Sequence, residues 1–209
     1  MWYRTILPFA LLFVMGLAWP SSYSDAQNPK KQKEAAYQGK TVGQWVNILK
    51  SSKSTGERKK AAEALGKISP VTKEVVPVLI GALKDKEYIV RGKAALALGR
   101  IGPAAKEAAP VLIRALERGE DTFLVEAAYA LGNIGPVTKD VVPALIKRLK
   151  DSDPGIRITT ALALGRIGPA AKKAVPILKV VSENDPVSRC RSAAAKALKR
   201  IQLPENSWK

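Results

Sequence analysis

The chain repeats itself every 33 residues, and this period limits its possible folds more than any other feature. The twelve residues ALALGRIGPAAK occur twice, beginning at Ala95 and at Ala161. The shorter motif Leu-Gly-x-Ile keeps the same step and begins at Leu65, Leu98, Leu131 and Leu164. A fifth, degenerate copy, Leu198-Lys199-Arg200-Ile201, comes one residue late. A fixed period of about 20–50 residues is the sequence signature of a repeat architecture.

Each repeat contains the signals of two helices. In the second repeat the first helix is expected around VPVLIGALKD, with Pro77 in the first turn, where a missing N–H costs little. The second helix is expected over YIVRGKAALALGRI, and Gly102-Pro103 then ends it. Alanine and leucine dominate the apolar content, and aromatic residues make up only 6%, which favours helices over strands.

Two helices of this length cannot bury their own apolar faces, so neighbouring repeats must stack. We therefore expect an all-α fold, a right-handed α-solenoid of about five two-helix repeats over residues 41–202. Comparison of the copies identifies two columns of unchanged alanines, which we interpret as buried seams between helices. The first column is Ala62, Ala95, Ala128, Ala161 and Ala195, and the second is Ala64, Ala97, Ala130, Ala163 and Ala197.

The segments VRGKAALALGRIG and GPAAKEAAPVLIRAL resemble the HEAT-like repeats first associated with phycobilisome lyases. The resemblance covers residues 41–202. The family also tends to carry an Asp in the turn and an Arg entering the second helix, and the matching pairs are Asp85/Arg91, Asp151/Arg157 and Asp185/Arg191. The first repeat has Arg58 without the acid, whereas the third has Arg118 and Leu124 instead. Because both members are lost together, we expect a structural pair, either a cap or a bond between repeats.

The residue inventory argues against catalysis. The chain has no histidine, which excludes histidine-dependent acid–base chemistry and histidine-ligated metals, including the iron site of deoxyhypusine hydroxylase-like relatives. Its single cysteine, Cys190, cannot form an internal disulfide, and we interpret it as a small buried side chain, with a reactive thiol as the alternative. We predict a protein that is not an enzyme and needs no metal or cofactor. A lyase-type enzyme subunit is the less favoured alternative.

The variable positions of the second helix predict a binding surface. Positions i, i+3 and i+7 share one face of a helix, and in HEAT-like solenoids these helices line the concave surface. The apolar centre Leu96–Tyr129–Leu162, flanked by Lys and Arg, is typical of a binding surface; the alternative is a poorly exposed seam of drifted residues. The face comprises Lys60, Glu63, Lys67; Lys93, Leu96, Arg100; Glu126, Tyr129, Asn133; Thr159, Leu162, Arg166; and Ala193, Lys196, Arg200. We take the candidate binding residues to be Lys93, Leu96, Arg100, Glu126, Tyr129, Asn133, Leu162 and Arg166.

A second candidate site is a basic ridge at the inter-repeat edge, formed by Lys73, Lys106, Lys139 and Lys172. The formal net charge is +17, so the surface attracts anionic partners. Lysines repeated at the pitch of stacked helices could hold a polyanion such as an envelope polymer, anionic lipid or nucleic acid. The alternative, which we favour, is a solvated surface whose cations suit helix C-termini and alternate with Glu74, Glu107 and Asp140.

The N-terminus has the features of a signal peptide. Arg4 precedes an apolar stretch, and small residues around Ala26 suit cleavage there. We expect residues 1–26 to be a signal peptide, 27–40 a basic linker and 203–209 a C-terminal tail. The expected product is an exported, periplasmic or extracellular monomer that acts as a protein–protein interaction scaffold; the alternative is an N-terminal membrane anchor. The expected partner is a protein, acidic or extended.

Overall fold

The computed structural model describes residues 36–68, 73–119 and 123–202; the predicted signal peptide, most of the predicted linker and the predicted tail lie outside the described residues. Residues 36–41, at the end of that linker, form an antiparallel hairpin of β1 (Ala36–Tyr37) and β2 (Lys40–Thr41). Five helix pairs follow within the described ranges. They are α2 (Val42–Ser51) with α3 (Thr55–Leu65), α4 (Val75–Ala82) with α5 (Tyr88–Ile101), α6 (Ala109–Arg118) with α7 (Leu124–Ile134), α8 (Val141–Arg148) with α9 (Pro154–Ile167), and α10 (Val175–Asn184) with α11 (Ser188–Gln202).

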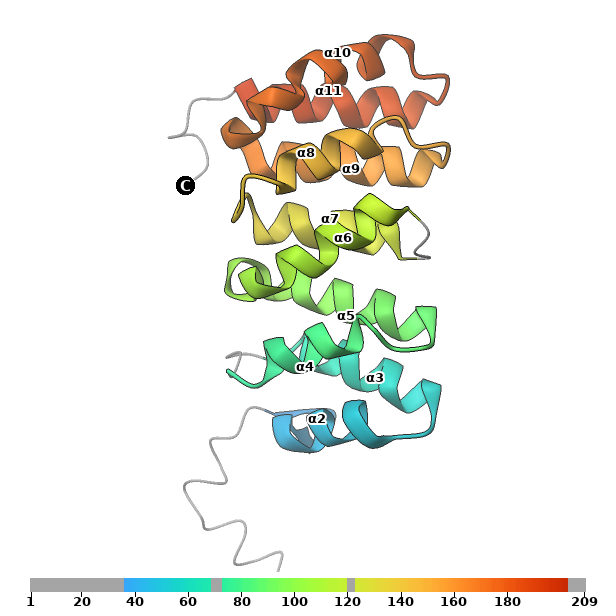
Figure 1. Cartoon of the computed structure of the whole chain (residues 1–209), viewed down its shortest axis with the longest axis vertical. Coiled ribbons are helices and arrows are strands. Elements are labelled where there is room, and N and C mark those ends of the chain that lie inside the picture. The colour runs from blue at the N-terminus through green and yellow to red at the C-terminus, as the bar shows by residue number, and fades with distance from the viewer. Residues whose placement is uncertain (1–35, 69–72, 120–122, 203–209) are drawn as a thin grey trace, which may run out of the picture. The chain divides into compact units, whose positions relative to one another are not determined.

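The helix pairs of residues 36–202 stack in chain order, which confirms the predicted α-solenoid (Figure 1). The even-numbered helices, here called A helices, lie toward the viewer, and the odd-numbered B helices lie behind them. Each B helix packs along the B helix of the next pair, whereas contacts between successive A helices are sparser. Closer packing on the B side is what a curved solenoid has on its inner side.

The Leu-Gly-x-Ile motif places a glycine where two B helices touch. A Cβ added to Gly66 would lie 2.6 Å from the Cα of Ala97, and one added to Gly132 would lie 2.6 Å from the Cα of Ala163. These distances are far below van der Waals contact, so the second alanine column packs directly on the glycine of the preceding repeat. At the fifth copy Lys199 replaces the glycine and is exposed, since no further described helix packs on α11.

The predicted alanine seams are confirmed at every member except Ala195. The first column is fully buried from Ala62 to Ala161, but its fifth member, Ala195, is exposed. That prediction was wrong because this column faces the following repeat, and in the described array nothing follows α11.

The helix boundaries follow the predicted glycine and proline signals. Gly102, Gly135 and Gly168 follow the last residues of α5, α7 and α9 with φ of 69°, 88° and 69°, a conformation that side chains with a Cβ rarely adopt. The chain then passes through the 3₁₀ segments η2 (Gly102–Ala108) and η3 (Gly168–Ala174) in two of the repeats. Pro77 and Pro110 lie in the first turns of α4 and α6, as predicted.

The first repeat closes the core with an aromatic side chain. Trp45 of α2 is 5% exposed, and its Nε1 donates a hydrogen bond of 2.9 Å to the carbonyl oxygen of Tyr37 in β1. Thr41 caps α2 through a capping box with Gln44. The hairpin therefore covers an end of the array that has no preceding helix pair among the described residues.

Candidate functional site

The predicted binding residues lie on three consecutive B helices, α5, α7 and α9. Arg100 and Arg166 are exposed, and the other six are half-buried, so all eight reach the surface. Their equivalents in the first and fifth repeats also reach the surface, apart from Ala193, which is buried although the sequence predicted it as exposed. We call this surface the B face, defined by Glu63, Lys67, Lys93, Leu96, Arg100, Glu126, Tyr129, Asn133, Leu162, Arg166, Lys196 and Arg200.

Tyr129 is held in a fixed position at the centre of the B face. Its ring lies against Gly99 of α5, where an added Cβ would be 3.0 Å from the ring carbons Cδ1 and Cε1. On its other side the guanidinium of Arg166 from α9 lies 5.1 Å from the ring centroid, which is a cation–π contact. One aromatic side chain therefore links the B helices of three repeats.

Sequence reasoning missed a second row beside the B face, one helical turn before the first, whose member on α5 is a buried glycine. Gly92, Val125 and Ile158 precede Leu96, Tyr129 and Leu162 by four residues, and Val125 is 37% exposed. The i, i+4 spacing could have identified this row. It widens the apolar centre on α7 and α9, while Gly92 leaves space that Glu126 occupies, since its Oε1 would lie 3.4 Å from an added Cβ.

Charged contacts join the first two repeats on this face. The carboxylate of Glu63 lies 3.0 Å from the Nζ of Lys67 and 3.8 Å from the Nζ of Lys93. The hydrogen bond from Lys67 lowers the pKa of Glu63 most, and nearby Lys93 and Arg100 lower it further, so this carboxyl is ionised at neutral pH. Lys67 also donates a hydrogen bond of 3.2 Å to the hydroxyl of Tyr37.

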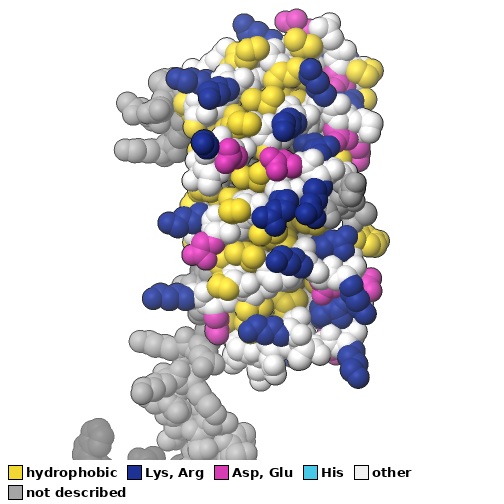
Figure 2. Space-filling view, in the orientation of Figure 1, with side chains coloured by type: hydrophobic (Ala, Val, Ile, Leu, Met, Phe, Trp, Pro, Cys, Tyr) yellow, Lys and Arg dark blue, Asp and Glu magenta, His cyan; other side chains and the backbone are white. Residues whose placement is uncertain are grey.

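The lysines of the predicted basic ridge are all exposed. They lie in the connections that lead from each B helix to the next A helix, at Lys73, Lys106, Lys139 and Lys172. Exposed acids follow the first three of them directly, whereas Lys173 follows the fourth. Figure 2, which views the array from the side of the A helices, shows Lys and Arg side chains scattered over the face in view, with fewer acidic ones among them.

The Asp and Arg pairs connect repeats and take no part in the B face. Arg58 donates to both carboxylate oxygens of Asp85 in the next repeat, from Nε at 2.7 Å and from Nη2 at 3.0 Å. Arg157 holds Asp185 in the same way, at 2.8 and 2.9 Å. The predicted inter-repeat bond is present, and Arg58 does have an acid, contributed by the repeat that follows. The Arg hydrogen bond is also the main cause that lowers the pKa of each aspartate.

Within a repeat the arginine side chain bonds the backbone carbonyl oxygens of the turn. Arg91 donates from Nη1 to the carbonyl oxygen of Asp85 at 2.9 Å, and Arg191 does so to that of Asp185 at 2.7 Å. The third repeat, which lacks both members of the pair, is joined to the fourth differently. Arg148 of α8 bonds the carbonyl oxygen of Leu116 and lies 3.0 Å from a carboxylate oxygen of Asp151.

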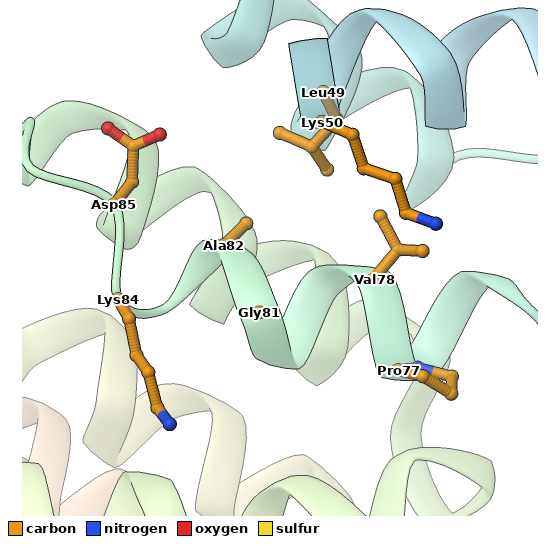
Figure 3. A pocket seen from close by; sticks show the side chains of 8 residues that line it. All are labelled: Leu49, Lys50, Pro77, Val78, Gly81, Ala82, Lys84 and Asp85. Atoms are coloured by element: carbon orange, nitrogen blue, oxygen red, sulfur yellow. The ribbon is translucent and has the colours of Figure 1, made fainter.

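A cleft of about 420 Å³ opens on the opposite side of the array, between α2 and α4 (Figure 3). Leu49 and Lys50 line it from α2, and Pro77, Val78, Gly81 and Ala82 line it from α4. Gly81 keeps it open, because nothing lies within 4 Å of a Cβ added there. Lys84 and Asp85 also line the cleft, and the side chains of Lys50, Lys84 and Asp85 point in three different directions.

Neither a membrane span nor a metal site is present in the described ranges. Over residues 36–68, 73–119 and 123–202, no helix is both long and apolar enough to span a bilayer. In the same ranges no three acidic or cysteine side chains gather closely enough to ligate a metal ion. Cys190 is buried, and this burial raises the pKa of its thiol.

A family model described as HEAT repeats matches residues 43–132 and 123–199. No curated protein sequence matches the chain. Among solved structures, a chain in the complex of CpcE and CpcF of phycocyanin lyase from a Nostoc species is 31% identical, with a TM-score of 0.67 over 81% of this chain and 69% of that one. An engineered protein is 27% identical, with a TM-score of 0.57 over 77% and 78%. A designed armadillo repeat protein in complex with the peptide (KR)4 is 18% identical, with a TM-score of 0.58 over 77% and 81%, a likeness of fold alone.

Proposed function

Because the chain belongs to the HEAT-repeat family, we propose that it is a non-catalytic scaffold that binds a protein partner on the B face. The observation that carries the proposal is Tyr129, an accessible aromatic ring held between Gly99 and Arg166 at the centre of the face. Aromatic and arginine side chains at the centre of a surface are the residues that most often dominate protein binding. The half-buried Leu96 and Leu162 flank it and add apolar area.

The relatives support a protein partner over a small molecule. The similar Nostoc chain comes from a complex of two proteins, CpcE and CpcF. The cleft beside Gly81 contains two lysines that point apart, whereas the B face offers a continuous row of side chains across the B helices. Solenoids commonly use such extended inner surfaces for binding.

The test is a pull-down from envelope extract with the wild-type chain and a double variant, Tyr129→Ala with Leu96→Ala. Capture of the partner should fall at least tenfold, because removing a central anchor typically costs about 2 kcal/mol or more. Far-UV circular dichroism should stay unchanged, because both side chains are only half-buried. Val180→Ala on α10 is the matched control, since Val180 is an exposed apolar residue on an A helix. Unchanged capture by the double variant would refute the B face as the binding surface.

A second candidate function is polyanion binding through the basic ridge, supported by the exposure of all four lysines. Binding to heparin or polyphosphate should then weaken steeply with salt in a log–log plot, because each neutralised anionic group of the polymer releases counterions. Replacing Lys106, Lys139 and Lys172 with Gln should reduce that slope. The similarity to the Nostoc complex also leaves a lyase-type subunit as an alternative. The absence of histidine favours the scaffold.

We propose export for the mature chain, with cleavage after Ala26. The apolar stretch behind Arg4 supports this. N-terminal sequencing of exported protein should begin at Gln27, whereas an intact Met1 in a membrane fraction would favour an anchor. We also propose a monomer, because Lys199 stands in the place of the motif glycine and puts a long charged side chain where a further B helix would pack. Light scattering coupled to gel filtration would reveal a dimer.

A further inference from the structure

The last positions of the B face form a row of cations with one interruption. This row lies near the C-terminal ends of the B helices, where positive charge also complements the helix dipole. Four of its members are exposed cations, and the third repeat contributes a half-buried amide instead. In order along the array the members are Lys67, Arg100, Asn133, Arg166 and Arg200.

The interruption coincides with the apolar centre of the face. Asn133 lies on α7, four residues after Tyr129, whose ring packs on Gly99 and under Arg166. A partner that runs along the row therefore meets Lys67, which also contacts Glu63, and then Arg100. It next meets an aromatic ring beside an amide, and then Arg166 and Arg200. The charge pattern matches an acidic segment with an apolar residue at its middle.

The spacing of the row indicates which backbone conformation the partner segment adopts. Packed helices lie about 8–10 Å apart, so the backbones that carry consecutive members of the row are separated by about that distance. In a β-strand the side chains of one face recur every second residue, at about 6.6 Å, which is too short. In a polyproline II helix they recur every third residue, at about 9 Å, which fits.

We propose that the B face binds an acidic protein segment in the polyproline II conformation, laid across the B helices. Its acidic residues recur at every third position and face Lys67, Arg100, Arg166 and Arg200, while a central apolar residue packs on Tyr129. This inference rests on the proposed function, since it names the partner of the same surface. It adds the chemistry, the conformation and the register of the segment.

Three synthetic peptides of identical composition test the register by fluorescence anisotropy with the full chain. Each contains four acids and a leucine in a proline-rich sequence. In the first peptide these five residues recur at every third position with the leucine in the middle; in the second they recur at every second position in the same order, and in the third the acids form one block. The first should bind about tenfold more tightly than the other two, because they align fewer acids with the cations. Equal binding of all three would overturn the register. Failure of the first peptide to bind would overturn the proposal as a whole.

A charge-matched pair of variants tests the surface. Arg100→Gln with Arg166→Gln should weaken binding of the first peptide about tenfold, whereas Lys84→Gln with Lys147→Gln, both exposed and near the ends of A helices, should change it less than twofold. An equal loss of peptide affinity in both variants would show that binding responds to net charge alone, and this would overturn the proposal. Heparin binding that exceeds peptide binding and depends on the ridge lysines would favour a polyanion.

The pull-down with the Tyr129 and Leu96 double variant separates this proposal from the proposed function. If that variant loses its partner while the three peptides bind equally, the scaffold function stands and the register is wrong. If partner capture persists in that variant, the B face is not the binding surface and both proposals fail.

Discussion

Replacing Gly132 with alanine tests the packing of successive B helices. The added Cβ would lie 2.6 Å from the Cα and 2.7 Å from the Cβ of Ala163, where ordinary contact begins at 3.4 Å. The obstacle is backbone, so α9 must retreat from α7 by roughly 0.8 Å. The contact between these two helices is among the most extensive of the array, so the strain falls on a junction that the fourth and fifth repeats need.

Overpacking of this kind typically costs about 1–3 kcal/mol. Replacing glycine with alanine inside a helix recovers up to about 1 kcal/mol, because alanine restricts the unfolded chain and is the best helix former. We therefore expect Gly132→Ala to lower the free energy of unfolding by about 1–2 kcal/mol. Stacked repeats depend on their interfaces with neighbours, so the transition should also broaden as the last two repeats unfold earlier.

Gly81→Ala is the matched control for this substitution. Gly81 lies inside α4, and nothing is within 4 Å of a Cβ added there, so only the helix-propensity gain of about 0.5–1 kcal/mol remains. Urea unfolding followed by far-UV circular dichroism measures both variants against the wild type. If Gly132→Ala is as stable as Gly81→Ala, the close approach of α7 and α9 does not exist as described.

Three further predictions concern the junctions and the core. Asp185→Asn removes the charge of Asp185 from its largely buried pair with Arg157, so the free energy of unfolding in urea should fall by about 1–3 kcal/mol. A decrease below about 0.5 kcal/mol would contradict a structural role of this pair. Hydrogen bonds from Arg58 and Arg157 lower the pKa of Asp85 and Asp185. The stabilisation from these two carboxylates is therefore complete above the ordinary carboxyl pKa of about 3.9, and it is lost as the pH falls through the lowered values. Stability should consequently fall more steeply with acid in the wild type than in a variant with both aspartates changed to Asn. Thr160→Val should raise the free energy of unfolding by about 1 kcal/mol, measured by thermal unfolding, because the buried hydroxyl of Thr160 has no hydrogen-bond partner among the described residues. The other four repeats have alanine at this position. A loss of stability would indicate a hydrogen bond to this hydroxyl.

The repeat period was sufficient to predict the helix pairs, because each signal is local. Gly102 ends α5 with a positive φ, and Pro110 begins α6, as their places in the sequence indicated. Burial of the alanine columns also followed, since a residue that recurs in every copy occupies the same environment. The exception was Ala195, whose burial depends on a repeat that does not follow it in the described array.

The candidate site was predictable in outline but not in its contacts. Helical spacing placed Leu96, Tyr129 and Leu162 on one face, and in the structure all three side chains are half-buried there. Whether this face binds a partner stays a prediction. The cation–π contact between Tyr129 and Arg166 joins residues of different repeats, and no spacing within one helix reveals it.

The sequence by itself determined the number of repeats, their helix boundaries and the division between packed and variable positions, because all of these depend on local signals repeated in register. Only the tertiary structure decided which partners meet across repeats. Arg58 pairs with Asp85 of the next repeat, and Gly132 is a glycine because the backbone at Ala163 occupies the space of its side chain. Such contacts depend on how closely one helix pair approaches the next, and that distance is set by the packing of the whole array.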